Sequence, residues 1–129
     1  MAVSVAAYLE FLVTAVEDGG GQFLREPAVE ILSNDDLGIL EGTAEFADGS
    51  KLDLYLFTDT LGDFPVWVIY SYHYRAPDDT CVFRYDNSPH HRGKRFFPHH
   101  KHFGPQEIVN ECRPAHVRGI ISEIRTHLV

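Results

Sequence analysis

The chain is poor in cysteine, in basic residues and in long apolar runs. Its 129 residues include two cysteines, Cys81 and Cys112, which match no zinc-binding spacing and are too few for a disulfide scaffold. The apolar N-terminal stretch has no basic region before it and is interrupted at Glu10, which argues against a signal peptide and a membrane span. We therefore expect a cytoplasmic protein with reduced thiols and no membrane partner.

The charge balance is acidic, with 11 lysine and arginine residues against 19 aspartate and glutamate residues. The formal net charge of −8 argues against a surface that coats nucleic acid as a whole, and it could serve a basic partner protein. Hydrophobic residues make up 44% of the chain, which is enough to bury a core. The length predicts a single domain over residues 1–129.

Apolar residues at helical spacing predict one helix at each end of the chain. The first covers residues 4–17, with Ser4 as its N-cap and three glycines at 19–21 ending it. The second should carry Pro114 in its first turn and end near Leu128. Its apolar stripe consists of Val117, Ile120, Ile121, Ile124 and Leu128.

Between the helices the apolar period changes to two, which predicts strands. They are expected at 29–32, 37–46, 51–56, 66–75 and 80–86, and residues 87–113 are expected to form a long connection. A three-residue loop with Gly49 in the left-handed conformation pairs Glu45 with Lys51 and keeps both apolar sets inward. The predicted fold class is α+β: an antiparallel β-meander of four to five strands with an N-terminal and a C-terminal helix.

The hairpin formed by residues 66–86 is expected to have one aromatic and one polar face. A four-residue loop at 76–79 would pair Arg75 with Thr80 and place His73 opposite Val82. Tyrosines at 70, 72 and 74 would then form either core packing under a helix, which we favour, or a platform for stacking bases. The polar face would carry Ser71, His73, Arg84 and Asp86.

The segment 84–102 reads RYDNSPHHRGKRFFPHHKH and contains five of the eight histidines. Its five basic residues and one acidic residue give it a formal charge of +4 on this acidic chain. Imidazoles carry protons near neutral pH, and fixed cations bind phosphate, so the segment suits cleavage of RNA without a cofactor. The candidate catalytic residues are His73, His91, His99, His100, His102 and Asp86. The candidate phosphate or RNA contacts are Arg84, Arg92, Lys94, Arg95 and Lys101.

Other interpretations of these residues stay open at this point. His73 could be an ordinary sheet histidine, and Arg84 with Asp86 could be a structural ion pair. A metal could be bound by three converging histidines, His90, His100 and His102, although the surrounding cations oppose a dication.

Four motifs resemble the TumE-like family of small prokaryotic proteins. They are YSYHY at 70–74, FRYDN at 83–87, PHH at 89–91 and FPHHKH at 97–102. That family is described as the toxin half of two-gene toxin–antitoxin modules, so the resemblance implies a cognate antitoxin partner. Together with the residue chemistry it suggests a ribonuclease-like toxin. The alternatives are a non-catalytic module that binds RNA or the antitoxin, and a metal-binding protein.

Overall fold

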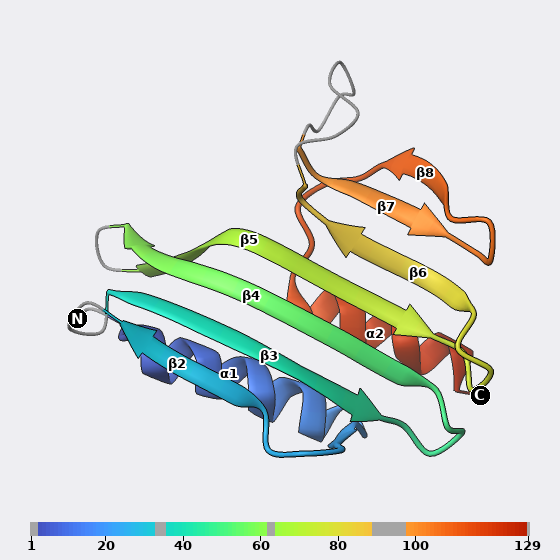
Figure 1. The fold of residues 1–129 in the computed structure, drawn as a ribbon, viewed down its shortest axis with the longest axis horizontal. Coiled ribbons are helices and arrows are strands. Elements are labelled where there is room, and N and C mark those ends of the chain that lie inside the picture. Colours follow the sequence, from blue (N-terminus) through green and yellow to red (C-terminus); the bar gives the residue numbers. More distant parts are fainter. Residues whose placement is uncertain (1–2, 33–35, 62–63, 89–97, 129) are drawn as a thin grey trace.

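The computed structural model of the protein describes residues 3–32, 36–61, 64–88 and 98–128. Within these residues the chain forms one antiparallel sheet of eight strands, with two helices behind it (Figure 1). The strand order is β1-β3-β4-β5-β6-β7-β8, and β2 also pairs with β3. The strands are β1 (Gln22–Phe23), β2 (Ala28–Leu32), β3 (Leu37–Glu45), β4 (Lys51–Leu61), β5 (Phe64–Arg75), β6 (Cys81–Asp86), β7 (His100–Phe103) and β8 (Ile108–Glu111).

The helices begin and end for local reasons. Helix α1 (Val5–Asp18) is capped by the Ser4 hydroxyl, which accepts a hydrogen bond from the Ala7 N–H at 3.0 Å, as predicted. Helix α2 (Val117–His127) begins only after His116, so the prediction that Pro114 lies in its first turn is wrong. Of the residues just before the helix, Pro114 is exposed and Ala115 is buried, and the Ala115 nitrogen lies 3.5 Å from the Tyr70 hydroxyl oxygen. Neither helix is long and apolar enough to span a membrane.

The core lies between the helices and the sheet. The apolar stripes of both helices face inward, and the tyrosines at 70, 72 and 74 are each only 1% exposed. The interpretation of these tyrosines as core residues is therefore confirmed, and they are too deeply buried to act as a platform for bases. The opposite face of the sheet, called the open face below, is covered by neither helix (Figure 1).

The β3–β4 hairpin has the predicted register. Glu45 pairs with Lys51 and Ala44 with Leu52, and Gly49 has a φ of +87°. The three-residue loop is closed by the hydrogen bond from the Phe46 N–H to the Ser50 carbonyl. Because a side chain at a φ this positive is strained, glycine is the residue that this turn requires.

The β5–β6 hairpin has a different register from the predicted one. Its loop contains three residues, closed by the hydrogen bond from the Ala76 N–H to the Thr80 carbonyl, with Asp79 at a φ of +71°. An irregularity follows, since Arg75 pairs with Cys81 but Tyr74 pairs with Phe83. His73 therefore lies opposite Arg84 rather than Val82. The shift is two residues, so every side chain keeps the face predicted for it.

The sheet is larger than predicted because residues 87–113 are not a single irregular connection. The FPHHKH motif enters strand β7, which pairs with β6, and strand β8 extends the sheet further. The pairing places Asp86 opposite His100 and Arg84 opposite His102. Within the described residues the sheet thus has eight strands instead of four to five, and the last three residues of the histidine motif lie on strand β7.

Candidate functional site

Strand β7 divides the His99–His102 run between the two faces of the sheet, because successive side chains alternate. Lys101 faces the helices: its Nζ lies 2.7 Å from Glu123 Oε2 of α2 and 4.6 Å from the centroid of the Tyr85 ring. His99 lies on the Tyr70 ring, with its Nδ1 2.8 Å from the tyrosine hydroxyl. The structure therefore does not bring Lys101 and His99 together with His100 and His102, which face the open side.

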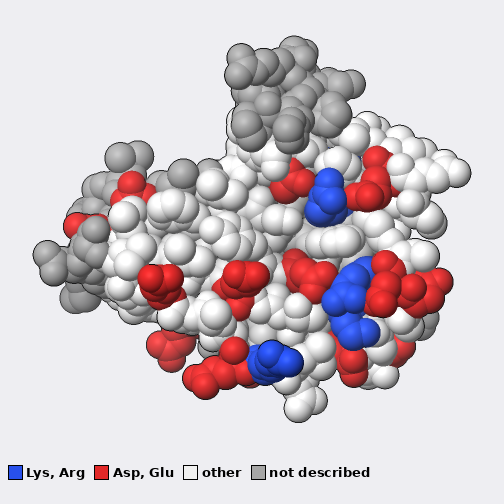
Figure 2. Space-filling model, viewed as in Figure 1, with Lys and Arg blue, Asp and Glu red and all other residues white. Residues whose placement is uncertain are grey.

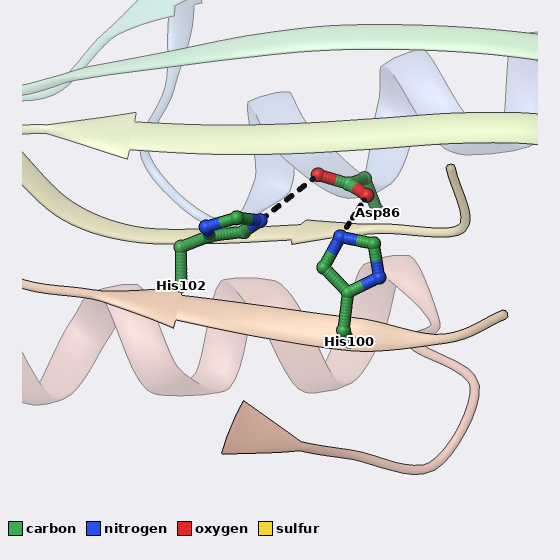
Figure 3. Close-up of side chains that lie close together, drawn as sticks. All are labelled: Asp86, His100 and His102. Carbon is green, nitrogen blue, oxygen red and sulfur yellow. Dashed lines mark ion pairs between the residues drawn. The ribbon is translucent and has the colours of Figure 1, made fainter. Parts of the chain in front are cut away.

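Asp86, His100 and His102 form a buried cluster on the open face, called the histidine–aspartate cluster below (Figure 3). Asp86 comes from β6 and both histidines come from β7. His100 Nε2 lies 2.6 Å from Asp86 Oδ1, and His102 Nε2 lies 3.6 Å from Asp86 Oδ2. The three residues are 3–8% exposed, so the carboxylate is held in a largely dry environment where charge interactions are strong.

Arg84 connects the cluster to solvent. Its Nε lies 3.1 Å from Asp86 Oδ2, its Nη2 lies 3.1 Å from His102 Nε2, and its Nη1 lies 3.0 Å from Glu107 Oε1. A guanidinium group can only donate hydrogen bonds, so His102 Nε2 must accept, and the His102 ring is neutral. Burial, and then the Arg84 charge, lower the pKa of His102, which agrees with this assignment.

His100 is placed differently, because both of its ring nitrogens face oxygen acceptors. Nε2 faces Asp86 Oδ1, and Nδ1 lies 3.0 Å from the Pro98 carbonyl oxygen. A doubly protonated ring satisfies both contacts at once. The Ser88 N–H also donates to Asp86 Oδ1, at 3.1 Å, so the carboxylate that orients His100 is itself fixed. The cluster thus holds a neutral imidazole next to one whose two ring nitrogens each face an oxygen acceptor.

A hollow of about 290 Å³ opens over the cluster. Arg84 and the cluster line it together with Ser71 and Ser88. The Arg84 side chain is 32% exposed, so its guanidinium can reach a molecule that enters from solvent. The hollow is therefore suited to an anionic group that also has a proton to give or to accept.

His73 lies next to this hollow and does not line it. It pairs across the sheet with Arg84, and its Nδ1 is 3.9 Å from Asp53 Oδ2. Its Nε2 is buried and has no hydrogen-bond partner among the described residues. Burial lowers the pKa of His73, so the ring is neutral at neutral pH.

The structure leaves part of the predicted site undescribed and adds two residues to it. His90, His91, Arg92, Lys94 and Arg95 lie outside the described residues. Sequence reasoning missed Ser88 and Glu107. The spacing from Asp86 to Ser88 is that of an Asx turn, and it could have indicated the hydrogen bond from the Ser88 N–H to the Asp86 carboxylate. Nothing in the sequence indicates the ion pair between Glu107 and Arg84, because Glu107 lies in the β7–β8 turn and its distance to Arg84 depends on a long-range strand pairing.

Fold and site together define an α+β protein with a buried histidine, aspartate and arginine constellation on the uncovered face of an antiparallel sheet. The sequence profile of the family described as Toxin TumE matches residues 22–128, and the chain therefore belongs to the toxin TumE family. The resemblance noted from the motifs is thereby confirmed. Neither the curated proteins nor the solved structures include a match to this chain.

Proposed function

We propose that the protein is the toxin of a two-gene module and cleaves RNA by metal-independent phosphoryl transfer at the histidine–aspartate cluster. The observation that supports this proposal best is the pairing of a neutral His102 with a doubly hydrogen-bonded His100 around a single hollow that also contains Arg84. This supplies a base, an acid and a fixed cation, which cleavage through the 2′-hydroxyl requires.

The proposed reaction uses each side chain once. His102 Nε2 accepts the proton of the 2′-hydroxyl while the 2′-oxygen forms a bond to phosphorus. His100 Nδ1 leaves the Pro98 carbonyl oxygen and donates its proton to the 5′-oxygen as the bond between phosphorus and that oxygen breaks. The products are a 2′,3′-cyclic phosphate and a 5′-hydroxyl. Arg84 moves from His102 to the non-bridging phosphate oxygens, and Asp86 holds His100 in place.

Membership of a toxin family supports a cognate antitoxin protein as the natural partner. We propose that the two proteins meet in the cytoplasm and that the antitoxin keeps the toxin inactive. If the site only binds RNA, or only binds the antitoxin, wild-type protein and every variant of the cluster will leave RNA uncleaved.

A metal site at the same position is the second candidate function. The ligand atoms of Asp86, His100 and His102 lie within 4.8 Å of one another. The contact of His100 Nδ1 with the Pro98 carbonyl also resembles the outer contact that metal-binding histidines make. Against it stands Arg84, whose guanidinium already contacts two of the three side chains and repels a dication.

Purified protein and a short RNA with a single labelled end test these candidates. Wild type should cleave the RNA in EDTA and leave a 2′,3′-cyclic phosphate, whereas RNA with a 2′-deoxy group at the cleaved position should stay intact. His100→Asn and His102→Gln should each lower the rate by about 100-fold or more. His116→Gln, at an exposed histidine that occupies the N-cap position of α2 and lies outside the lining of the hollow, serves as the matched control.

Three results would contradict the proposal. Folded wild-type protein that cleaves none of the RNAs would contradict the proposed reaction. Cleavage that disappears in EDTA and returns with zinc or manganese would replace it with the metal-dependent candidate. Equal loss of activity in His116→Gln would show that the cluster has no special part in the reaction.

A further inference from the structure

A second and larger hollow lies on the open face, beside the histidine–aspartate cluster. Its volume is about 500 Å³, and Ser71 lines both hollows, so the two adjoin. Strands β3, β4 and β5 form its floor, and the segment that connects β1 to β2 forms one wall. Figure 2 shows this face of the molecule, and acidic side chains outnumber basic ones over β2–β5.

Some of the charged groups in the second hollow already bind one another. Asp53 accepts a hydrogen bond from the Thr43 hydroxyl at 2.7 Å and one from Arg75 Nε at 2.8 Å. Arg75 also contacts Asp79. This network leaves Asp53 and Arg75 with little capacity to bind an added ion, and it fixes the floor of the hollow.

The lining contains two other carboxylates, those of Glu26 and Glu41. Glu26 and Glu41 are exposed, and neither forms an ion pair with a cation in the described part of the chain. The lining contains one further cation, Arg25, which is also exposed. Leu24, which is 54% exposed, and the half-buried Tyr55 ring provide apolar surface next to the carboxylates.

The chemistry of this lining selects a particular ligand. Carboxylates accept hydrogen bonds and attract positive charge, and an aromatic ring favours a planar cation on its face. A guanidinium group is planar, carries five N–H donors and has an apolar stem that can cover Leu24. A phosphate or a nucleotide fits poorly, because Glu26 and Glu41 repel an anion.

We propose that the second hollow binds the arginine side chain of a basic segment of a partner protein. The carboxylates of Glu26 and Glu41 receive the guanidinium, and Tyr55 lies against its plane. Because Ser71 lines both hollows, the bound segment lies next to Arg84 and the histidine–aspartate cluster and obstructs access to them. This binding site does not depend on whether the cluster cleaves RNA.

The test uses two synthetic tripeptides, acetyl-Ala-Arg-Ala-amide and its citrulline counterpart, which keeps the shape and lacks the charge. Titration of ¹⁵N-labelled protein should show amide shifts in β3–β5 around the second hollow with the arginine peptide, and at least about tenfold weaker binding of the citrulline peptide. The double variant Glu26→Gln/Glu41→Gln should bind the arginine peptide at least about tenfold more weakly than wild type does. Glu45→Gln, on the same strand as Glu41 but paired with Lys51 and outside the lining, should bind as wild type does.

The proposal is overturned if the two peptides bind equally, if neither shifts these amides at millimolar concentration, or if Glu45→Gln weakens binding as much as the double variant. Guanosine monophosphate that shifts the same amides more strongly than the arginine peptide would also overturn it, in favour of a nucleotide site. The peptide titrations do not measure RNA cleavage. A negative titration therefore does not contradict the proposed ribonuclease activity, and a negative cleavage assay does not contradict the arginine-binding site.

Discussion

Replacing Asp86 with asparagine should destabilise the protein far more than the same change at Asp53. The Asp86 carboxylate is the acceptor for His100 Nε2 at 2.6 Å, for Arg84 Nε at 3.1 Å and for the Ser88 N–H at 3.1 Å. An asparagine keeps one acceptor oxygen but loses the charge and turns an N–H₂ group toward these donors. The Arg84 guanidinium and the His100 ring then lose the buried carboxylate that both contact.

The size of the effect follows from burial. The Asp86 side chain is 7% exposed and that of His100 is 4% exposed, so water replaces little of the lost interaction. Breaking a buried ion pair costs about 3–5 kcal/mol, and we expect about 3 because Arg84 keeps its contact with Glu107. For a domain of this size this is a fall in Tm of roughly 10 °C. The Asp53 side chain is 34% exposed, so Asp53→Asn should cost about 1 kcal/mol or less.

Urea unfolding followed by circular dichroism measures both variants against wild type. A double-mutant cycle with His100→Asn should give a coupling of about 1–3 kcal/mol between His100 and Asp86. The reasoning is refuted if Asp86→Asn loses no more stability than Asp53→Asn, or if the coupling is zero within error. Either result would mean that the cluster is open to water or that its side chains do not meet.

Three further predictions concern other positions. Burial lowers the pKa of His73, so below the ordinary histidine pKa the unfolded chain binds a proton at this residue more readily than the folded chain does, and the free energy of unfolding decreases as the pH falls. Between about pH 7 and 5 the free energy of unfolding of His73→Asn should therefore decrease less steeply than that of wild type. Equal slopes in urea unfolding measured across this pH range would contradict the prediction. Gly119→Ala should raise the unfolding free energy by about 1 kcal/mol, because Gly119 is exposed within α2 and an added Cβ meets no atom within 4 Å; an unchanged Tm would show otherwise. Lys101→Met should lower the free energy of unfolding by about 2 kcal/mol through the loss of the contact with Glu123, and it should not change the rate of RNA cleavage below the Tm of the variant. A loss of cleavage in the folded variant would mean that Lys101 does contact phosphate.

The candidate site was partly predictable because it depends on side-chain alternation. Period two placed Arg84 and Asp86 on one face, and the same alternation holds in β7 for His100 and His102. The sequence did not predict that residues 98–103 continue the sheet, because short histidine-rich and proline-containing segments have little strand character of their own. For the same reason the sequence alone predicts Lys101 as a phosphate contact, since the face on which its side chain lies is known only once residues 100–103 are recognised as a strand.

The sequence by itself determined the capped N-terminal helix, the apolar stripe of the C-terminal helix, the β3–β4 register and the family, because each depends on local spacing or on motifs that can be read along the chain. Only the tertiary structure decided that His73 meets Arg84 and that Asp86 meets His100. Those contacts depend on how the loop at 77–79 closes and on the irregularity after it, and a turn shorter by one residue shifts every pair beyond it. They also depend on the pairing of β7 with β6, which becomes favourable only when the rest of the sheet is in place.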